Sequence, residues 1–166
     1  EYTEFSGRPA IVIERFDRIL QRDGKVARIH QEDMCQATGR MPDRKYEDAG
    51  GPSAREMAAI LRSHARNAGP EIIKLADFLL INYAAEAPDG HTKNVSIRIL
   101  PSGNVTMSPL YDLASALPYE SLSMDRNLAL AIGGRRRIND IHSRQWTRAA
   151  RDLGLPEEQL RDRARY

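Results

Sequence analysis

The stretch from Pro70 to Tyr83 constrains the fold of this chain most, because nearly every side of the helix that it predicts is apolar. Its apolar residues are Ile72, Ile73, Leu75, Ala76, Phe78, Leu79, Leu80 and Tyr83. Such a helix is stable only when other elements cover it, so the stretch predicts a central, buried helix. A second helix is predicted before it, where Pro52 and Ser53 begin a run with apolar residues at helical spacing.

Short strands are predicted ahead of these helices. The dipeptides Ser6-Gly7 and Asp23-Gly24 are turn signals, and they predict hairpins over residues 5–16 and 18–28. A first helix is expected over residues 30–38. Residues 40–51 show no sustained periodicity and predict a loop of about a dozen residues, which is long enough to suggest function or mobility.

The C-terminal part is predicted to be mainly helical. One helical turn is expected over residues 113–117, residues 121–132 are ambiguous, and residues 135–140 are expected to be a polar linker. Ser143 is a good N-cap for a helix that ends at Leu153, and a last helix follows Pro156. Strands first and helices afterwards predict an α+β fold that is mostly helical.

Directly after the central helix lies the segment PDGHTKNVS, residues 88–96, in which Asp89 and Asn94 stand five residues apart. Phosphoryl-transfer enzymes use this spacing, because a carboxylate must orient or deprotonate the attacking hydroxyl while a neutral oxygen ligand holds Mg²⁺ on the phosphates. Two extended runs, over residues 95–100 and 105–110, flank a turn and lead to Asp112. A hairpin would therefore return Asp112 to the side of Asn94.

Length and composition limit the classes of protein. With 166 residues the chain predicts one domain, and a complete two-lobed kinase needs more. A formal net charge of +2 gives no general signal for nucleic acid. The single cysteine, the lack of a long apolar run and the lack of a signal peptide favour a cytoplasmic protein without a membrane anchor.

Several residues also have purely structural interpretations. The residue types of Pro88-Asp89-Gly90 favour turns whatever the function. Cys35 is expected to pack in the core and Trp146 to do the same, and the run Arg135–Arg137 is expected to be a solvated turn rather than a DNA contact. Three histidines without metal-ligand spacing are expected at the surface or in caps: His30, His64 and His142.

Together these residues resemble the C-terminal part of the HipA family, the kinase toxins of bacterial toxin-antitoxin pairs. The resemblance covers most of residues 13–117. The segments that carry it are IERFDR (13–18), QEDMCQ (31–36), KYE (45–47) with GGP (50–52), DGHTKNVS (89–96) and PLYD (109–112).

The resemblance implies a protein-kinase-like fold that phosphorylates serine or threonine in proteins, with aminoacyl-tRNA synthetases as a known class of target. It implies that Asp89 is the catalytic base or hydroxyl-positioning acid, and that Asn94 and Asp112 bind Mg²⁺. It also implies a set of contacts to ATP: hinge backbone groups of Glu14 and Phe16 at the adenine, His91 and Lys93 near the phosphates, and Tyr111 beside the nucleotide.

The chain departs from the kinase pattern in its phosphate-binding parts. It has no glycine-rich nucleotide loop, and no lysine precedes Lys25. We therefore expect the C-terminal lobe alone, with the N-lobe missing: a hinge strand and short hairpins over residues 1–29, and a helical lobe over residues 30–166 that contains the catalytic-loop hairpin 88–112. Such a lobe is expected to be inactive by itself.

The alternative function is a non-catalytic binding module that docks an antitoxin or a companion N-lobe. A HipB-like, DNA-binding antitoxin is the partner implied by the resemblance. Direct contact of this chain with nucleic acid is not expected.

Overall fold

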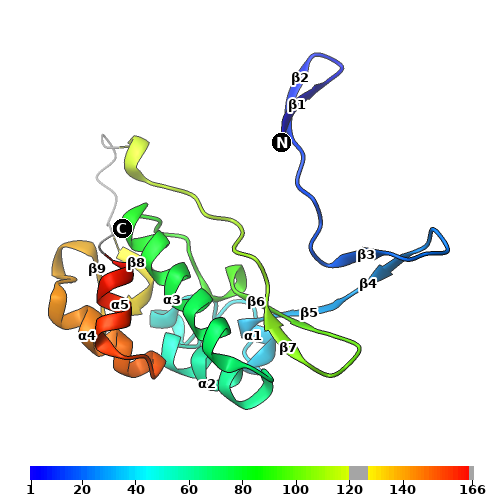
Figure 1. The fold of residues 1–166 in the computed structure, drawn as a ribbon. Coiled ribbons are helices and arrows are strands. Elements are labelled where there is room, and N and C mark those ends of the chain that lie inside the picture. Colours follow the sequence, from blue (N-terminus) through cyan, green and yellow to red (C-terminus); the bar gives the residue numbers. More distant parts are fainter. Residues whose placement is uncertain (120–126, 165–166) are drawn as a thin grey trace.

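The computed structural model describes residues 1–119 and 127–164 (Figure 1). Two hairpins form the N-terminal arm, residues 1–28: β1 (Tyr2–Phe5) pairs with β2 (Arg8–Ile11), and β3 (Arg18–Leu20) pairs with β4 (Val26–Arg28). Both turns lie where the turn dipeptides predict them, with Gly7 and Gly24 at positive φ. The arm extends away from the helical body (Figure 1). The first hairpin was expected to extend to residue 16, but β2 ends at Ile11.

A three-stranded antiparallel sheet lies where the arm meets the body. It contains β5 (His30–Asp33), β6 (Ser96–Ile99) and β7 (Val105–Met107), in that order. The expected helix over residues 30–38 is wrong for its first half, because His30 to Asp33 pair with β6 instead. Only α1 (Met34–Ala37) is helical; Asp33 caps it by accepting a hydrogen bond from the backbone of Gln36.

The helical body contains α2 (Ala54–His64), α3 (Ala68–Ala84), α4 (Ser143–Leu153) and α5 (Glu157–Arg163). Ser53 caps α2 in a reciprocal arrangement with Glu56. The central helix α3 begins two residues before Pro70, which a helix tolerates in its first turn. The N-cap of α4 is His142, so Ser143 is the first helical residue rather than the cap.

Two C-terminal predictions are corrected. Residues 135–140 are not a linker: β9 (Arg135–Arg137) pairs with β8 (Asn127–Ile132), and a 3-10 turn follows over Ile138–Asp140. Gly133 and Gly134, both at positive φ, join the strands; a Cβ on Gly133 would lie 2.2 Å from the carbonyl oxygen of Gln145. The helical turn expected over 113–117 is instead a 3-10 turn over Leu117–Tyr119. Of the ambiguous stretch 121–132, residues 121–126 lie outside the described residues.

The core lies between α2, α3, α4, α5, β7 and β8, and it confirms the prediction of a buried central helix. Its largest fully buried side chains include Met34, Met57, Leu61, Leu75, Phe78, Met107, Ile132, Leu153 and Leu160. Cys35 is buried and Trp146 packs against the core, as expected. Among the described residues, no helix combines the length and apolar character needed to cross a membrane.

Candidate functional site

The site begins where α3 ends. The backbone N–H of Ala87 donates to the carbonyl of Asn82, which turns the chain sharply after the helix. Gly90 then packs directly on the Asn82 side chain, because a Cβ on Gly90 would lie 1.9 Å from Asn82 Oδ1. Any larger residue would have to displace this buried side chain, so the close packing of Gly90 on α3 holds the neighbouring Asp89 beside the end of the helix.

Asn94 joins the two ends of the site. Its side chain is buried, and its Nδ2 donates to the backbone carbonyl of Asp89 (3.2 Å) and to that of Asp112 (3.3 Å). The hairpin of β6 and β7 thus returns Asp112 to the side of Asn94. One buried carboxamide gathers two acidic residues that are far apart in the sequence.

The polar groups of these three residues suit a hard cation. The Oδ1 atom of Asn94 accepts no hydrogen bond within the described residues, and Asp112 is exposed. Asp112 has φ +58°, a left-handed conformation that aspartate tolerates better than most residues and that is frequent at functional sites. Mg²⁺ prefers oxygen ligands and is often held by one or two side chains together with phosphates and water. The described residues contain no cluster of three His, Cys, Asp or Glu side chains that could hold a metal without such help.

Tyr46 contacts the carboxylate of Asp89 directly. The phenol donates to Asp89 Oδ1 at 2.5 Å, and this hydrogen bond, with burial, raises the pKa of Tyr46 to about 12. The Asp89 side chain is otherwise open, with 60% of its surface exposed. Tyr46 also packs edge-on against His91, with ring centroids 5.4 Å apart.

His91 is buried beside this pair. Burial, and then the positive charge of Lys45, lower its pKa, so the ring is neutral at pH 7. Its Nε2 lies 3.9 Å from Asp89 Oδ1, and its buried Nδ1 has no hydrogen-bond partner among the described residues. His91 therefore lies at the same place as Asp89, with one ring nitrogen unsatisfied.

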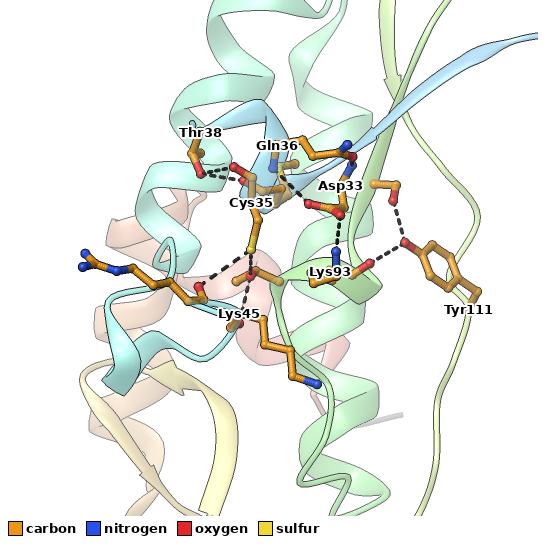
Figure 2. A network of polar contacts seen from close by, with 11 residues as sticks. Asp33, Cys35, Gln36, Thr38, Lys45, Lys93 and Tyr111 are labelled. Carbon is orange, nitrogen blue, oxygen red and sulfur yellow. Dashed lines mark hydrogen bonds and ion pairs between the residues drawn. The ribbon is translucent and has the colours of Figure 1, made fainter. Parts of the chain in front are cut away.

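Lys93 points to the other side of the loop. Its ammonium group binds Asp33 Oδ2 at 2.9 Å, and this hydrogen bond raises the Lys93 pKa (Figure 2). The Tyr111 hydroxyl donates to the carbonyl of Lys93 at 2.7 Å and lies 2.5 Å from Ser96 Oγ. A phosphate contact by Lys93 stays a prediction, and it would compete with this ion pair.

The arm reaches the site through Phe16. Its ring stacks on Tyr111, with centroids 6.0 Å and planes 29° apart, and its carbonyl accepts a hydrogen bond from Arg98 (3.4 Å). The next residue, Asp17, is held by Arg15, which lowers the Asp17 pKa to about 2. Phe16 and Tyr111 are thus brought together, whereas Glu14 is exposed and none of the described contacts ties it to the site.

The sequence pattern did not single out Tyr46 or Asp33 as site residues. Tyr46 belongs to the long loop over residues 40–51, and its signals were the length of that loop and the segment KYE (45–47), which carries part of the family resemblance without a role for the tyrosine. Asp33 was placed inside an expected helix, where a partnership with Lys93 could not be foreseen.

Fold and site together define an α+β domain in which the loop after a buried helix and the end of a hairpin meet around one asparagine. A family of known domains matches this description. The chain belongs to the HipA-like C-terminal domain family, whose sequence profile matches residues 1–166.

Two relatives from Sinorhizobium fredii carry the names "Putative kinase Y4mE" and "Putative kinase Y4dM". The first is 38% identical over 150 residues, which are 90% of this chain and 35% of that protein. The second is 29% identical over 110 residues, which are 66% of this chain and 24% of that protein.

A solved structure from Shewanella oneidensis MR-1 is similar over 99% of this chain and 40% of its own, with a TM-score of 0.85 and 28% identity. It is described as the toxin-antitoxin system HipA, HipB and its operator DNA complex. The chain therefore spans well under half the length of each of these relatives.

Proposed function

We propose that this chain is the catalytic C-terminal lobe of a serine/threonine protein kinase of the HipA type. The observation that carries the proposal is the Asn94 amide, which holds the backbones of Asp89 and Asp112 together at 3.2 and 3.3 Å. The kinase names of two relatives support it.

In this proposal the Asp89 carboxylate orients the hydroxyl of a protein substrate and takes its proton as the oxygen attacks the γ-phosphorus of ATP. The new P–O bond forms as the bond to the β-phosphate oxygen breaks, and ADP leaves. Mg²⁺, held by Asn94 Oδ1 and the Asp112 carboxylate, would neutralise charge on the phosphates. Because His91 is neutral at pH 7, it would meet the phosphates as a hydrogen-bonding group rather than as a cation.

The nucleotide base would lie near the stacked pair of Phe16 and Tyr111, with the backbone of residues 14–16 as the hinge. Phosphate clamping would come from an N-lobe outside this chain. Exposed apolar side chains along the arm support docking against such a lobe: Tyr2, Phe5, Ile11, Ile13, Leu20 and Val26 are each at least 63% exposed.

The partners are proposed from the relatives and from the family resemblance. A HipB-like antitoxin is proposed because the Shewanella protein is solved with HipB. The protein substrate is proposed to be an enzyme of translation, such as an aminoacyl-tRNA synthetase.

The test is phosphoryl transfer from Mg-ATP by the chain together with its N-lobe. Asp89→Ala should abolish transfer and leave ATP binding intact, whereas Asp112→Ala should weaken the Mg-dependent part of binding. Asp23→Ala, at the exposed turn between β3 and β4, is the matched control and should behave as the parent does. If Asp89→Ala and Asp112→Ala both retained full activity, the kinase assignment would be wrong and a non-catalytic binding module would replace it.

A further inference from the structure

The loop over residues 40–51 is bound to the candidate site on the N-terminal side of Tyr46. The carbonyl of Lys45 accepts two hydrogen bonds from Thr92, one from the backbone N–H at 3.1 Å and one from Oγ1 at 2.8 Å (Figure 2). Thr92 is fully buried within the same segment as Asp89. The residue before Tyr46 is therefore fixed to the segment that carries the candidate catalytic acid.

The C-terminal side of Tyr46 is fixed as well. Glu47 Oε2 accepts a hydrogen bond from the backbone N–H of Ala131 in β8 at 2.7 Å, and Asp48 forms an ion pair with Arg136 in β9. These contacts join the loop to the C-terminal hairpin. Tyr46 thus lies between two anchored neighbours.

The backbone of Tyr46 itself closes a tight turn. Its carbonyl accepts hydrogen bonds from the N–H groups of Ala49 (3.1 Å) and Gly51 (2.9 Å). A Cβ on Gly51 would lie 2.7 Å from the carbonyl oxygens of both Arg44 and Tyr46, so only glycine closes this turn. Because these hydrogen bonds fix the backbone around Tyr46, its phenol is directed to one place.

That place is one oxygen of the Asp89 carboxylate. The phenol binds Oδ1 at 2.5 Å, whereas Oδ2 accepts no hydrogen bond within the described residues. A hydrogen bond to a charged acceptor is stronger than one between neutral groups, so it can select one rotamer of an exposed side chain. Oδ2 is left as the oxygen that can accept a proton.

We propose that Tyr46 is a positioning residue for phosphoryl transfer, whose phenol holds Oδ1 of Asp89 so that Oδ2 faces the acceptor hydroxyl. This inference rests on the proposed function. Because Tyr46 acts through Asp89 and not on the nucleotide, its loss lowers kcat and leaves the KM for ATP unchanged. A misplaced reacting group costs on the order of 100-fold in rate, so we expect a fall of about 10- to 100-fold.

The experiment compares the parent with Tyr46→Phe, which removes only the hydroxyl. The assay measures ADP release from Mg-ATP, with water as the acceptor, by the chain together with its N-lobe. Tyr83→Phe is the matched control: Tyr83 is also half-buried, but its hydroxyl makes only one long contact, 3.5 Å to the carbonyl of Ile141. Tyr46→Phe should lower kcat with the melting temperature unchanged, and Tyr83→Phe should not.

A second measurement tests the contact itself by the absorbance of tyrosinate at about pH 11, above the usual phenol pKa. The difference between the parent and Tyr46→Phe should be small, since the pKa of Tyr46 is about 12. In the Asp89→Ala background the same difference should grow, because the hydrogen bond that raises this pKa is lost.

The rate of ADP release separates the role of Tyr46 from the proposed function. An active parent whose rate is unchanged in Tyr46→Phe overturns the positioning role alone. A faster Tyr46→Phe also overturns it, because the phenol would then occupy the place of the acceptor. A parent that neither releases ADP with water as the acceptor nor phosphorylates any protein hydroxyl overturns the proposed function and the role of Tyr46 with it.

Discussion

Replacing Asn94 by aspartate tests whether this side chain acts as a hydrogen-bond donor that joins two loops. Its amide donates to two backbone carbonyls at 3.2 and 3.3 Å. Each hydrogen bond contributes about 0.5–1.5 kcal/mol, and these are long, so Asn94→Ala should lower the free energy of unfolding by about 1–2 kcal/mol. Asn94→Asp loses the same donors and turns a buried carboxylate towards the carbonyls, so it should cost more than alanine.

The assay is urea unfolding at pH 7 without metal, followed by circular dichroism. With a slope of about 2 kcal/mol per molar urea, the midpoint should fall by about 0.5–1 M for Asn94→Ala and further for Asn94→Asp. Burial raises the pKa of the introduced carboxyl, so the native state binds its proton more tightly and Asn94→Asp should regain stability as the pH falls. Asn67→Asp, at the start of α3, is the control and should not lower the midpoint. An Asn94→Asp variant as stable as the parent would refute the donor role.

Three other positions of the chain can be tested in the same way. Gly90→Ala should cost about 1–3 kcal/mol in thermal unfolding, because its Cβ would overlap the Asn82 side chain. Asp112→Asn should melt with the parent, whereas Asp112→Ala should lose about 1 kcal/mol, because alanine fits φ +58° poorly. The ionised Asp17 carboxylate should stabilise the parent above the ordinary pKa of aspartate, 3.8, and this contribution should fade as the pH drops to about 2. Asp17→Asn should lack the contribution, because Arg15 then has no carboxylate partner. Acid titration followed by circular dichroism checks both.

The fold could be predicted where local signals and tertiary contacts agree. The central helix follows from its apolar residues, and both turns of the arm follow from turn dipeptides. Residues 30–33 were predicted to be helical but form β5, because pairing with β6 overrides a weak local preference. Arg135–Arg137 were predicted to be part of a linker but form β9, because a run of charged residues shows no alternation of apolar and polar residues that would indicate a strand.

The site could be predicted only in part. The approach of Asp112 to Asn94 could be predicted, because the sequence shows two extended runs of similar length around a turn, and such a hairpin returns the chain to its start. The contact of Tyr46 with Asp89 spans 43 residues, and that of Lys93 with Asp33 spans 60. Such contacts depend on how separate elements pack, and neither turn signals nor periodicity contains that information.

Asp89, Asn94 and Asp112 are proposed to form a site for phosphoryl transfer from Mg-ATP. The most direct measurement is calorimetric titration of ATP, with and without Mg²⁺, into the chain together with its N-lobe, beside Asp112→Asn. We expect tighter binding with Mg²⁺ in the parent and loss of that gain in Asp112→Asn, which should melt with the parent. Equal affinity with and without Mg²⁺, or a gain that Asp112→Asn retains in full, would contradict the proposed site.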